Sequence, residues 1–308
     1  MRLLITGAGG LLGLNLALDA MRWHEVTGLS RGRLTGAPFP FLQVDLLETG
    51  AMVRALEESR AEAVVHCAAA ADLDFCERNP HLAHRINVEV PEQIASECTK
   101  RDIRMIHIST DAVFDGRKRG EYTEADEPCP VGVYAVTKRA AEDAVIRASR
   151  QAIVARVNFY GWSASGQRSL AEFFVNNLRK GSGVHGFVDV WFCPMLVNDL
   201  ADLLLALVVS DLHGVYHVVG PQAMTKYQFG VEIARRFGFN EALIAPQAVE
   251  DSGLVARRSH NLRLSTHKLS TELGWPLPGF STGIERFYSQ YTQGYPQKVR
   301  SYRAEQPG

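Results

Sequence analysis

The sequence of 308 residues lacks the features that mark disulfide-rich, zinc-binding or nucleic-acid-binding proteins. It has five cysteines, an odd number, and no two of them form a CxxC pair. Scattered thiols are typical of a reducing compartment, so we expect free cysteines and a cytoplasmic location. The 33 Lys and Arg residues are balanced by 34 Asp and Glu residues, for a formal net charge of −1. This balance argues against a nucleic-acid partner, and no spacing of histidines and cysteines predicts a metal site.

Long apolar runs are also missing. No uninterrupted stretch reaches the roughly 18 apolar residues of a membrane-spanning helix. The apolar segment Val197–Ser210 is interrupted by Asp199 and Asp202, which favours a buried helix. The chain begins with a β-prone run, without a charged segment and an apolar one before it, so we expect no signal peptide and no membrane partner.

β-Prone segments alternate with helical ones along the first half of the chain. The expected strands are Arg2–Thr6, Glu25–Leu29, Phe41–Val44, Ala63–Cys67, Arg104–Ser109 and Ala152–Val157. The expected helices are Leu11–Ala20, Gly50–Arg60, Asn79–Arg101 and Tyr134–Ser149. Such alternation predicts an α/β protein with a doubly wound parallel sheet of the Rossmann type.

The alternation loosens after Gly161, which predicts a second, smaller α/β lobe. We expect residues 1–157 to form the sheet domain, rejoined by about 185–218, with His213–Val219 as a strand returning to the sheet. Residues 158–184 and 219–295 would form the second lobe. The polar end, 296–308, is expected to be a tail, and such chain ends can be disordered.

Three glycines follow the first expected strand and open the first expected helix. Gly7 would permit a tight turn, Gly10 would let the backbone approach a pyrophosphate, and Gly13 would let helix pack on strand. Leu11 and Leu12 begin the helix, whose free N–H groups and positive partial charge favour phosphate binding. The spacing is GxxGxxG, so an ordinary glycine-rich turn is the alternative interpretation.

Residues after the next strands indicate how the rest of a dinucleotide would bind. At the end of the second strand stand Ser30 and Arg31, where an acidic residue would favour NAD; a hydroxyl and a guanidinium suit the 2′-phosphate of NADPH. NADH stays open, because a solvated loop arginine is the alternative. The further cofactor contacts that we expect are Asp45, Leu46, Ala69, Ala70, Ala71 and Ile108.

A tyrosine and a lysine four residues apart supply the predicted chemistry. Tyr134 and Lys138 would share one helix face, and a nearby ammonium lowers the pKa of a phenol. Lys138 can also hold ribose hydroxyls of the cofactor. Tyr134 and Lys138 are therefore both expected to contact the cofactor as well. Thr110 lies just beyond the fifth strand, where its hydroxyl could fix a carbonyl oxygen, and Asp111 beside it could orient a sugar hydroxyl. Thr110, Tyr134 and Lys138 are therefore the expected catalytic residues.

With these motifs the chain resembles extended short-chain dehydrogenases/reductases, and within them the dTDP-4-dehydrorhamnose reductases. The segment Ser109–Gly116 is similar to that subgroup's STDYVFDG, and Asp74–Pro80 to its D-x-x-E-x-x-P. The resemblance implies that the sheet domain binds NAD(P) and that the second lobe binds the substrate, with Thr110, Asp111, Phe159 and Arg258 as substrate-binding residues. Ala112 stands where the subgroup usually has tyrosine, and Phe159 where it has tryptophan, which puts the identity of the sugar in doubt.

The resemblance implies an NADPH-dependent reductase of a nucleotide-activated 4-keto-6-deoxy sugar, with a homodimer as one possible assembly. Two alternatives stay open. One is a non-catalytic NADP-binding regulatory subunit, against which the intact Thr110, Tyr134 and Lys138 argue. The other is an NAD-dependent nucleotide-sugar epimerase.

Overall fold

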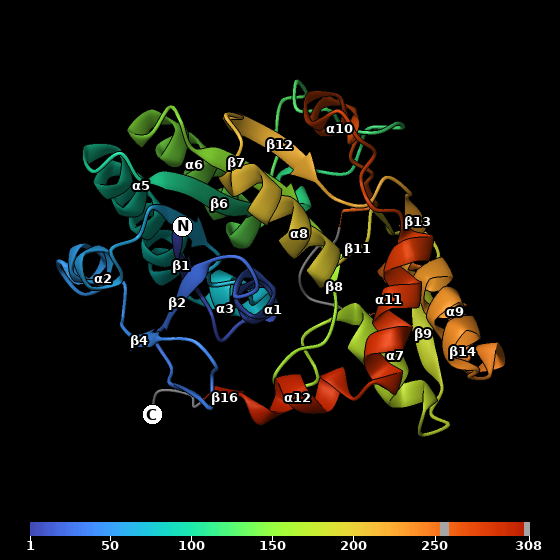
Figure 1. Ribbon diagram of the computed structural model, residues 1–308. Coiled ribbons are helices and arrows are strands. Elements are labelled where there is room, and N and C mark those ends of the chain that lie inside the picture. Colours follow the sequence, from blue (N-terminus) through green and yellow to red (C-terminus); the bar gives the residue numbers. More distant parts are fainter. Residues whose placement is uncertain (253–258, 305–308) are drawn as a thin grey trace.

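The computed structural model describes residues 1–252 and 259–304 of the chain, and its centre is a seven-stranded, wholly parallel sheet (Figure 1). In sheet order the strands are β12 (Gly214–Val218), β7 (Ile153–Val157), β6 (Arg104–Thr110), β5 (Ala63–His66), β1 (Arg2–Thr6), β2 (Glu25–Ser30) and β4 (Phe41–Gln43). The order runs outward in both directions from β1 and β5, so the doubly wound fold predicted from the sequence is confirmed.

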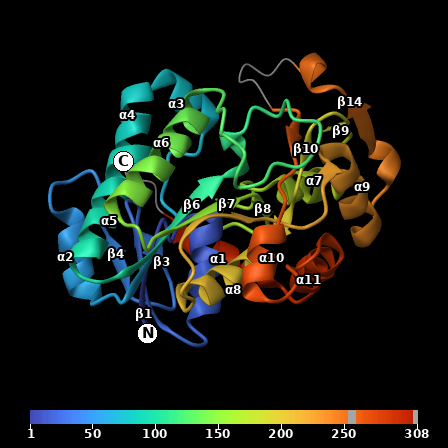
Figure 2. The ribbon, with the colours of Figure 1, turned by 90° about the horizontal axis from the view of Figure 1, so that it is seen from above.

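Helices cover both faces of this sheet, as Figure 2 shows from above. On one face α1 (Leu11–Ala20) packs against α8 (Val197–Val208). The other face carries α2 (Ala51–Ser59), α3 (Leu73–Arg78), α4 (Pro80–His84), α5 (Val90–Lys100) and α6 (Val133–Ala148). Because both faces are covered, β5 and β7 are buried along their whole lengths, as parallel strands normally are.

The segment predicted as one helix from Asn79 to Arg101 is divided. It consists of α4, a π-helical turn at Arg85–Glu89, and α5. Pro91 in the first turn of α5 has no N–H to donate to the preceding turn, and a wider π turn there accommodates that loss. The turn contains buried Asn87, which reaches the candidate site described below.

A smaller lobe stands beside the sheet and has its own aromatic core. Its helices are α7 (Leu170–Leu178), α9 (Lys226–Phe237) and α11 (Phe280–Thr292), and its short strands are β8 (Phe159–Tyr160), β9 (Val184–Phe187), β10 (Trp191–Phe192), β11 (Met195–Leu196), β13 (Met224–Thr225), β14 (Ile244–Gln247) and β15 (Asn261–Leu262). Phe229 and Phe287 are fully buried at its centre, against Tyr160. The lobe is therefore held by its own apolar contacts.

The chain returns from this lobe to the sheet where α8 packs on α1 and β12 pairs with β7. The division into domains stays a prediction. Strands β9 and β10 lie where the chain is expected to rejoin the large sheet. They pair instead with strands of the smaller lobe, β9 with β14 and β10 with β13 and β15. Helix α10 (His267–Leu273) lies back against β12.

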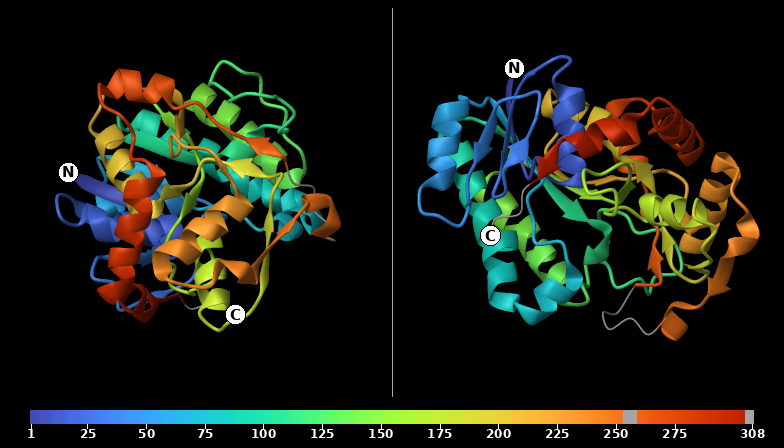
Figure 3. Two further views of the ribbon diagram at one scale, coloured as in Figure 1. Left: turned by 90° about the vertical axis from the view of Figure 1, so that its right-hand side faces the viewer. Right: turned by 90° about the horizontal axis from the view of Figure 1, so that it is seen from below.

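The C-terminal segment is ordered where the structure describes it. Helix α12 (Tyr295–Ser301) crosses from the lobe to the sheet domain (Figure 3), and β16 (Arg303–Ala304) pairs antiparallel with β3 (Leu34–Thr35). The expectation of a disordered tail is thus wrong for residues 296–304. Although the segment is polar overall, Val299 and Tyr302 bury their side chains against the main core, and this apolar contact outweighs the polar composition.

Among the helices of residues 1–252 and 259–304, none is both long and apolar enough to cross a bilayer.

The close approach of α1 to the glycine turn gives a first prediction. A Cβ on Gly13 would lie 2.3 Å from the Gly7 carbonyl oxygen. Alanine inside a helix normally stabilises by about 0.5–1 kcal/mol relative to glycine, but this overlap should reverse the sign. We expect Gly13→Ala to lower the free energy of unfolding by about 1–3 kcal/mol, measured by urea denaturation. The control is Gly120→Ala, where no heavy atom lies within 4 Å of the new Cβ. Equal stability of both variants would contradict the packing argument.

Candidate active site

The turn between β1 and α1 has the shape of a phosphate cradle. Gly7 has a φ of +68°, and a Cβ there would lie 2.7 Å from the backbone nitrogen of Ala68. Helix α1 begins after Gly10 with no side-chain cap and no acidic residue in its first turn, so its first N–H groups and positive partial charge face outward. The following residues, Leu11 and Leu12, turn into the helix. This geometry suits the binding of a dinucleotide pyrophosphate. A side chain at position 7 would overlap the backbone at Ala68.

The predicted adenosine contacts lie on adjacent strands at the same carboxyl edge. Ser30 ends β2 and pairs in register with Gln43 of β4, and the exposed Arg31 follows it. The Ser30 hydroxyl donates a 2.8 Å hydrogen bond to the Gly32 carbonyl. Asp45 accepts a 2.9 Å hydrogen bond from the Leu47 N–H, which shapes the turn that contains Leu46. The structure thus brings Ser30, Arg31 and Asp45 to one edge of the sheet.

The loop after β5 is held by Asn87, a residue that the sequence analysis did not identify. The side-chain amide of Asn87 accepts from the Ala70 N–H at 2.8 Å and donates to the Ala70 carbonyl at 3.0 Å. It also donates to the Thr137 hydroxyl on α6 at 3.1 Å. Ala69 and Ala71 remain exposed, so these two alanines line an open surface.

The expected catalytic residues come together from β6 and α6. Thr110 ends β6, whereas Tyr134 and Lys138 lie one turn apart at the start of α6. The start of α6 is held by Glu77, whose carboxylate accepts a 2.8 Å hydrogen bond from the Val133 N–H. A carboxylate at a helix N-terminus also interacts favourably with the helix dipole.

Helix α6 presents buried polar groups to the sheet, and each has a partner there. The Lys138 ammonium donates to the Ile108 carbonyl at 2.6 Å and to His107 Nε2 at 3.2 Å. One turn further, Glu142 accepts from the Ser109 hydroxyl at 2.6 Å. It also forms a two-bond ion pair with Arg156, at 3.0 and 2.7 Å. These contacts fix both the height and the rotation of α6 over the sheet.

Burial dominates the electrostatics of the pair on α6. It raises the pKa of Tyr134 to about 12, opposed by the Thr110 hydroxyl and reinforced by the charge of Asp111. It lowers the pKa of Lys138 to about 8, opposed by the charge of Glu142. Lys138 does not contribute to the shift of the Tyr134 pKa, since its ammonium donates to the Ile108 carbonyl and to His107, so its expected effect on the phenol stays a prediction. The phenol stays protonated at neutral pH.

Asp111 lies beside Thr110 and is 4% exposed. One of its carboxylate oxygens accepts from Asn158 Nδ2 at 2.5 Å, and the other from the Thr110 hydroxyl at 3.2 Å. Burial raises the pKa of Asp111 to about 6, opposed first by the hydrogen bond from Asn158. Phe159 follows Asn158 and is half-buried at the start of β8. Arg258, the other expected substrate contact, lies outside the described residues.

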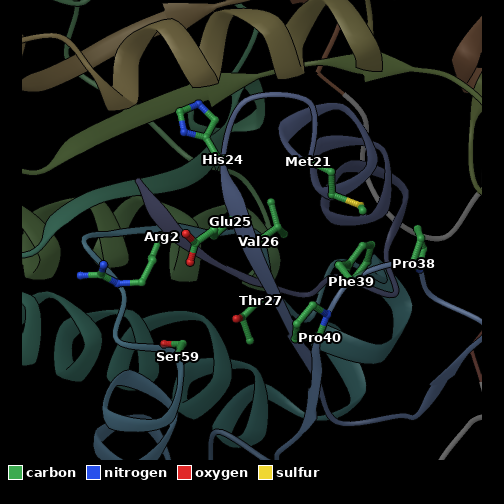
Figure 4. Close-up of a pocket in the computed structure, with 10 residues that line it drawn as sticks. All are labelled: Arg2, Met21, His24, Glu25, Val26, Thr27, Pro38, Phe39, Pro40 and Ser59. Carbon is green, nitrogen blue, oxygen red and sulfur yellow. The ribbon is translucent and has the colours of Figure 1, made fainter.

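A cavity of about 310 Å³ lies elsewhere, at the amino ends of β1 and β2 (Figure 4). Its lining includes Arg2, Met21, His24 and Phe39. Ligands of doubly wound sheets bind outside the carboxyl ends of the strands, so this cavity is separate from the glycine turn and from Tyr134.

Several residues that build the site were missed in the sequence. Glu142 carried a readable signal, because it follows Lys138 by four residues as Lys138 follows Tyr134, which places all three on one helix face. His107 and Arg156 occupy positions in buried strands where apolar residues are usual. Their partners are set by the register of α6 on the sheet, which no local pattern reveals.

Comparison with known proteins agrees with this architecture. The family model described as RmlD substrate binding domain matches residues 1–293. The chain is 32% identical to a probable low-salt glycan biosynthesis reductase of Haloferax volcanii, covering 94% of this chain and 98% of the relative. It is also 32% identical to a dTDP-4-dehydrorhamnose reductase of Mycobacterium tuberculosis, with 91% and 88% covered.

A third relative has a name of a different kind, methionine adenosyltransferase 2 subunit beta of Mus musculus, at 32% identity with 92% and 86% covered. Among solved structures, the dTDP-4-dehydrorhamnose reductase of Bacillus anthracis in complex with NADP superposes with a TM-score of 0.84. The two chains are 23% identical, and the match covers 94% of this chain and 99% of that one. The extent of the family match and the shared fold confirm the resemblance seen in the sequence: this chain belongs to the RmlD substrate binding domain family of Rossmann-fold, short-chain dehydrogenase/reductase-like proteins.

Proposed function

We propose that this protein is an NADPH-dependent reductase of a nucleotide-activated 4-keto-6-deoxy sugar. The observation that carries the proposal is the convergence of Thr110, Tyr134 and Lys138 at the carboxyl edge of the sheet that also holds the glycine turn. Membership of the family and the relatives named as reductases support the same reaction class.

Each part of the dinucleotide has a proposed partner. The turn of Gly7, Gly10 and Gly13, with Leu11 and Leu12, would hold the pyrophosphate. Ser30 and Arg31 would hold the 2′-phosphate, and Lys138 the nicotinamide ribose. The remaining proposed contacts are Asp45, Leu46, Ala69, Ala70, Ala71, Ile108 and Tyr134. When bound, NADPH supplies the hydride for the carbonyl carbon of the sugar.

The chain's own residues would handle the oxygen of that carbonyl. Thr110, whose single hydroxyl proton is directed at Asp111 in this structure, would turn that proton to the carbonyl oxygen and fix it. The Tyr134 hydroxyl would give the same oxygen a proton as negative charge develops. Because the pKa of Tyr134 is raised to about 12, the phenol is in the protonated form that reduction requires. Lys138 keeps a third N–H donor beyond the two directed at Ile108 and His107.

The substrate would lie over Asp111, whose carboxylate can accept from a sugar hydroxyl. Phe159 and Arg258 are the other proposed substrate contacts. A cytoplasmic location, where NADPH and nucleotide sugars are made, and assembly into a homodimer belong to the same proposal.

The first test of this function is Tyr134→Phe, which keeps the ring and deletes the hydroxyl. Loss of a positioned general acid typically slows a reaction by about 10²–10⁴-fold, so keto-sugar-dependent oxidation of NADPH, followed by absorbance, should fall by that factor. NADPH affinity, titrated separately by fluorescence, should change little because the glycine turn is untouched.

Wild-type turnover in this variant, where chemistry limits the rate, would refute the mechanism. A wild-type protein that binds NADPH but reduces no keto sugar across a panel of nucleotide sugars would favour the regulatory-subunit role; the mouse relative is named as a subunit of methionine adenosyltransferase 2. Tightly retained NAD would favour an epimerase.

The second test concerns the choice of cofactor. Arg31→Asp places a carboxylate where a 2′-phosphate would lie and should weaken NADPH binding by about 1–3 kcal/mol, the usual size of a charge-assisted contact. NADH affinity should change less, because NADH has no 2′-phosphate. Arg150→Asp makes the same charge change on an exposed turn at the far end of α6 and serves as the control. Equal losses for both cofactors would refute the assignment of Arg31.

A further inference from the structure

Two buried histidines lie side by side beneath the candidate active site, and the proposed reaction has so far given them no role. His66 on β5 and His107 on β6 are register partners, each about 1% exposed. Their rings stack with centroids 5.5 Å apart and an interplanar angle of 21°. Buried polar groups cost free energy unless they are satisfied, so a pair of imidazoles in a parallel sheet requires an explanation.

Hydrogen bonding on this pair is one-sided. His66 Nδ1 shares a 2.7 Å hydrogen bond with the Thr6 hydroxyl, and His107 Nε2 lies 3.2 Å from the Lys138 ammonium. The opposite nitrogens, His66 Nε2 and His107 Nδ1, have no hydrogen-bond partner among the described residues. If His107 served packing alone, an apolar side chain would fill the position without leaving a buried nitrogen unpaired.

The chemistry of Lys138 determines the tautomer of His107. A charged ammonium has three donors and no acceptor, so the nitrogen facing it must be the unprotonated one. His107 is therefore neutral, with its proton on Nδ1, and Nε2 accepts. Burial holds the pKa of His107 well below its ordinary value, and the charge of Lys138 lowers it further, in the direction that favours a neutral acceptor.

We propose that His107 is a positioning residue for the reductase: its Nε2, together with the Ile108 carbonyl, holds the Lys138 ammonium at a fixed place against β6. The effect of His107 on turnover rests on the proposed function. The contact by which His107 orients Lys138 and favours its charged form does not depend on that function.

The groups that face Lys138 come from three elements. His107 lies on β6, His66 on β5 with Cys67 directly after it, and Glu142 on α6 itself. Burial lowers the pKa of Lys138 to about 8, whereas the charge of Glu142 acts in the opposite direction. Since this pKa lies close to neutral pH, loss of the His107 acceptor would lower it further and leave a larger fraction of Lys138 uncharged at neutral pH.

The test substitutes His107→Phe, which keeps a planar ring against His66 but has no acceptor. The pKa of Lys138 is read from the pH titration of its ¹⁵Nζ signal in the full chain before any cofactor is added, with the signal assigned by Lys138→Arg. The wild type should titrate near 8. In His107→Phe the pKa should fall by about one unit, since one charge-assisted hydrogen bond favours the ammonium by roughly that amount.

Two matched variants separate hydrogen bonding from packing. His107→Gln restores a neutral acceptor and should bring the pKa back toward the wild-type value. Met105→Ala opens a cavity two residues earlier on the same face of β6, where Met105 is 1% exposed, and should lower stability without moving the titration. If His107→Phe fails to fold, His107→Met offers a flexible apolar replacement for the same measurement.

An unchanged Lys138 titration in His107→Phe, or an equal shift in Met105→Ala, would overturn the proposal. In turnover, the alkaline limb of the kcat profile should move to lower pH in His107→Phe and return in His107→Gln. If the titration shifts as expected but the wild type reduces no keto sugar, the proposed function fails while the role of His107 toward Lys138 stands.

Discussion

The arrangement of the site depends on how α6 docks with a polar inner face. Thr137, Lys138 and Glu142 are all buried on this helix, and each would carry a large desolvation cost without a partner. The sheet and the neighbouring π turn supply those partners at one relative position of helix and sheet, since Glu142 must meet Arg156 while Lys138 meets the Ile108 carbonyl. A shift by one helical turn would leave these groups unpaired, so the polar contacts set the register more narrowly than apolar packing could.

This register also explains how residues far from the proposed chemistry position Tyr134. The Glu77 carboxylate holds the first turn of α6 through the Val133 N–H, and Asn87 links the same helix to the loop after β5 through Thr137. The π turn at Arg85–Glu89 is what directs Asn87 toward both partners. The D-x-x-E-x-x-P motif recognised in the sequence thus has a physical role in capping the helix that carries the tyrosine.

Much of the fold was predictable because its signals are local. Helix α1 spans Leu11–Ala20 as expected from the glycine turn and the apolar run that follows, and the strands of the sheet fall where apolar runs predicted them. The parts that failed depend on distant contacts. The segment 295–304 has little apolar content, yet Val299 and Tyr302 find a place in the main core. The partners of Lys138 could not be predicted either. Helix spacing places Lys138 on the same face as Tyr134, but its ammonium donates to the Ile108 carbonyl and to His107, which lie on a distant strand.

Tyr134 and Lys138 on α6 have pKa values shifted in opposite directions, yet both are protonated at neutral pH. Burial raises the pKa of the phenol and lowers that of the ammonium, but values of about 12 and about 8 leave both groups protonated near pH 7. A protonated phenol can donate to a carbonyl oxygen, whereas the phenol would first have to ionise before it could take a proton from an alcohol. Because Thr110 lowers and Asp111 raises the pKa of Tyr134, the charge of Asp111 helps to keep the proton on the tyrosine. In this form the phenol can act as a proton donor, while the Ile108 carbonyl and His107 accept from the Lys138 ammonium.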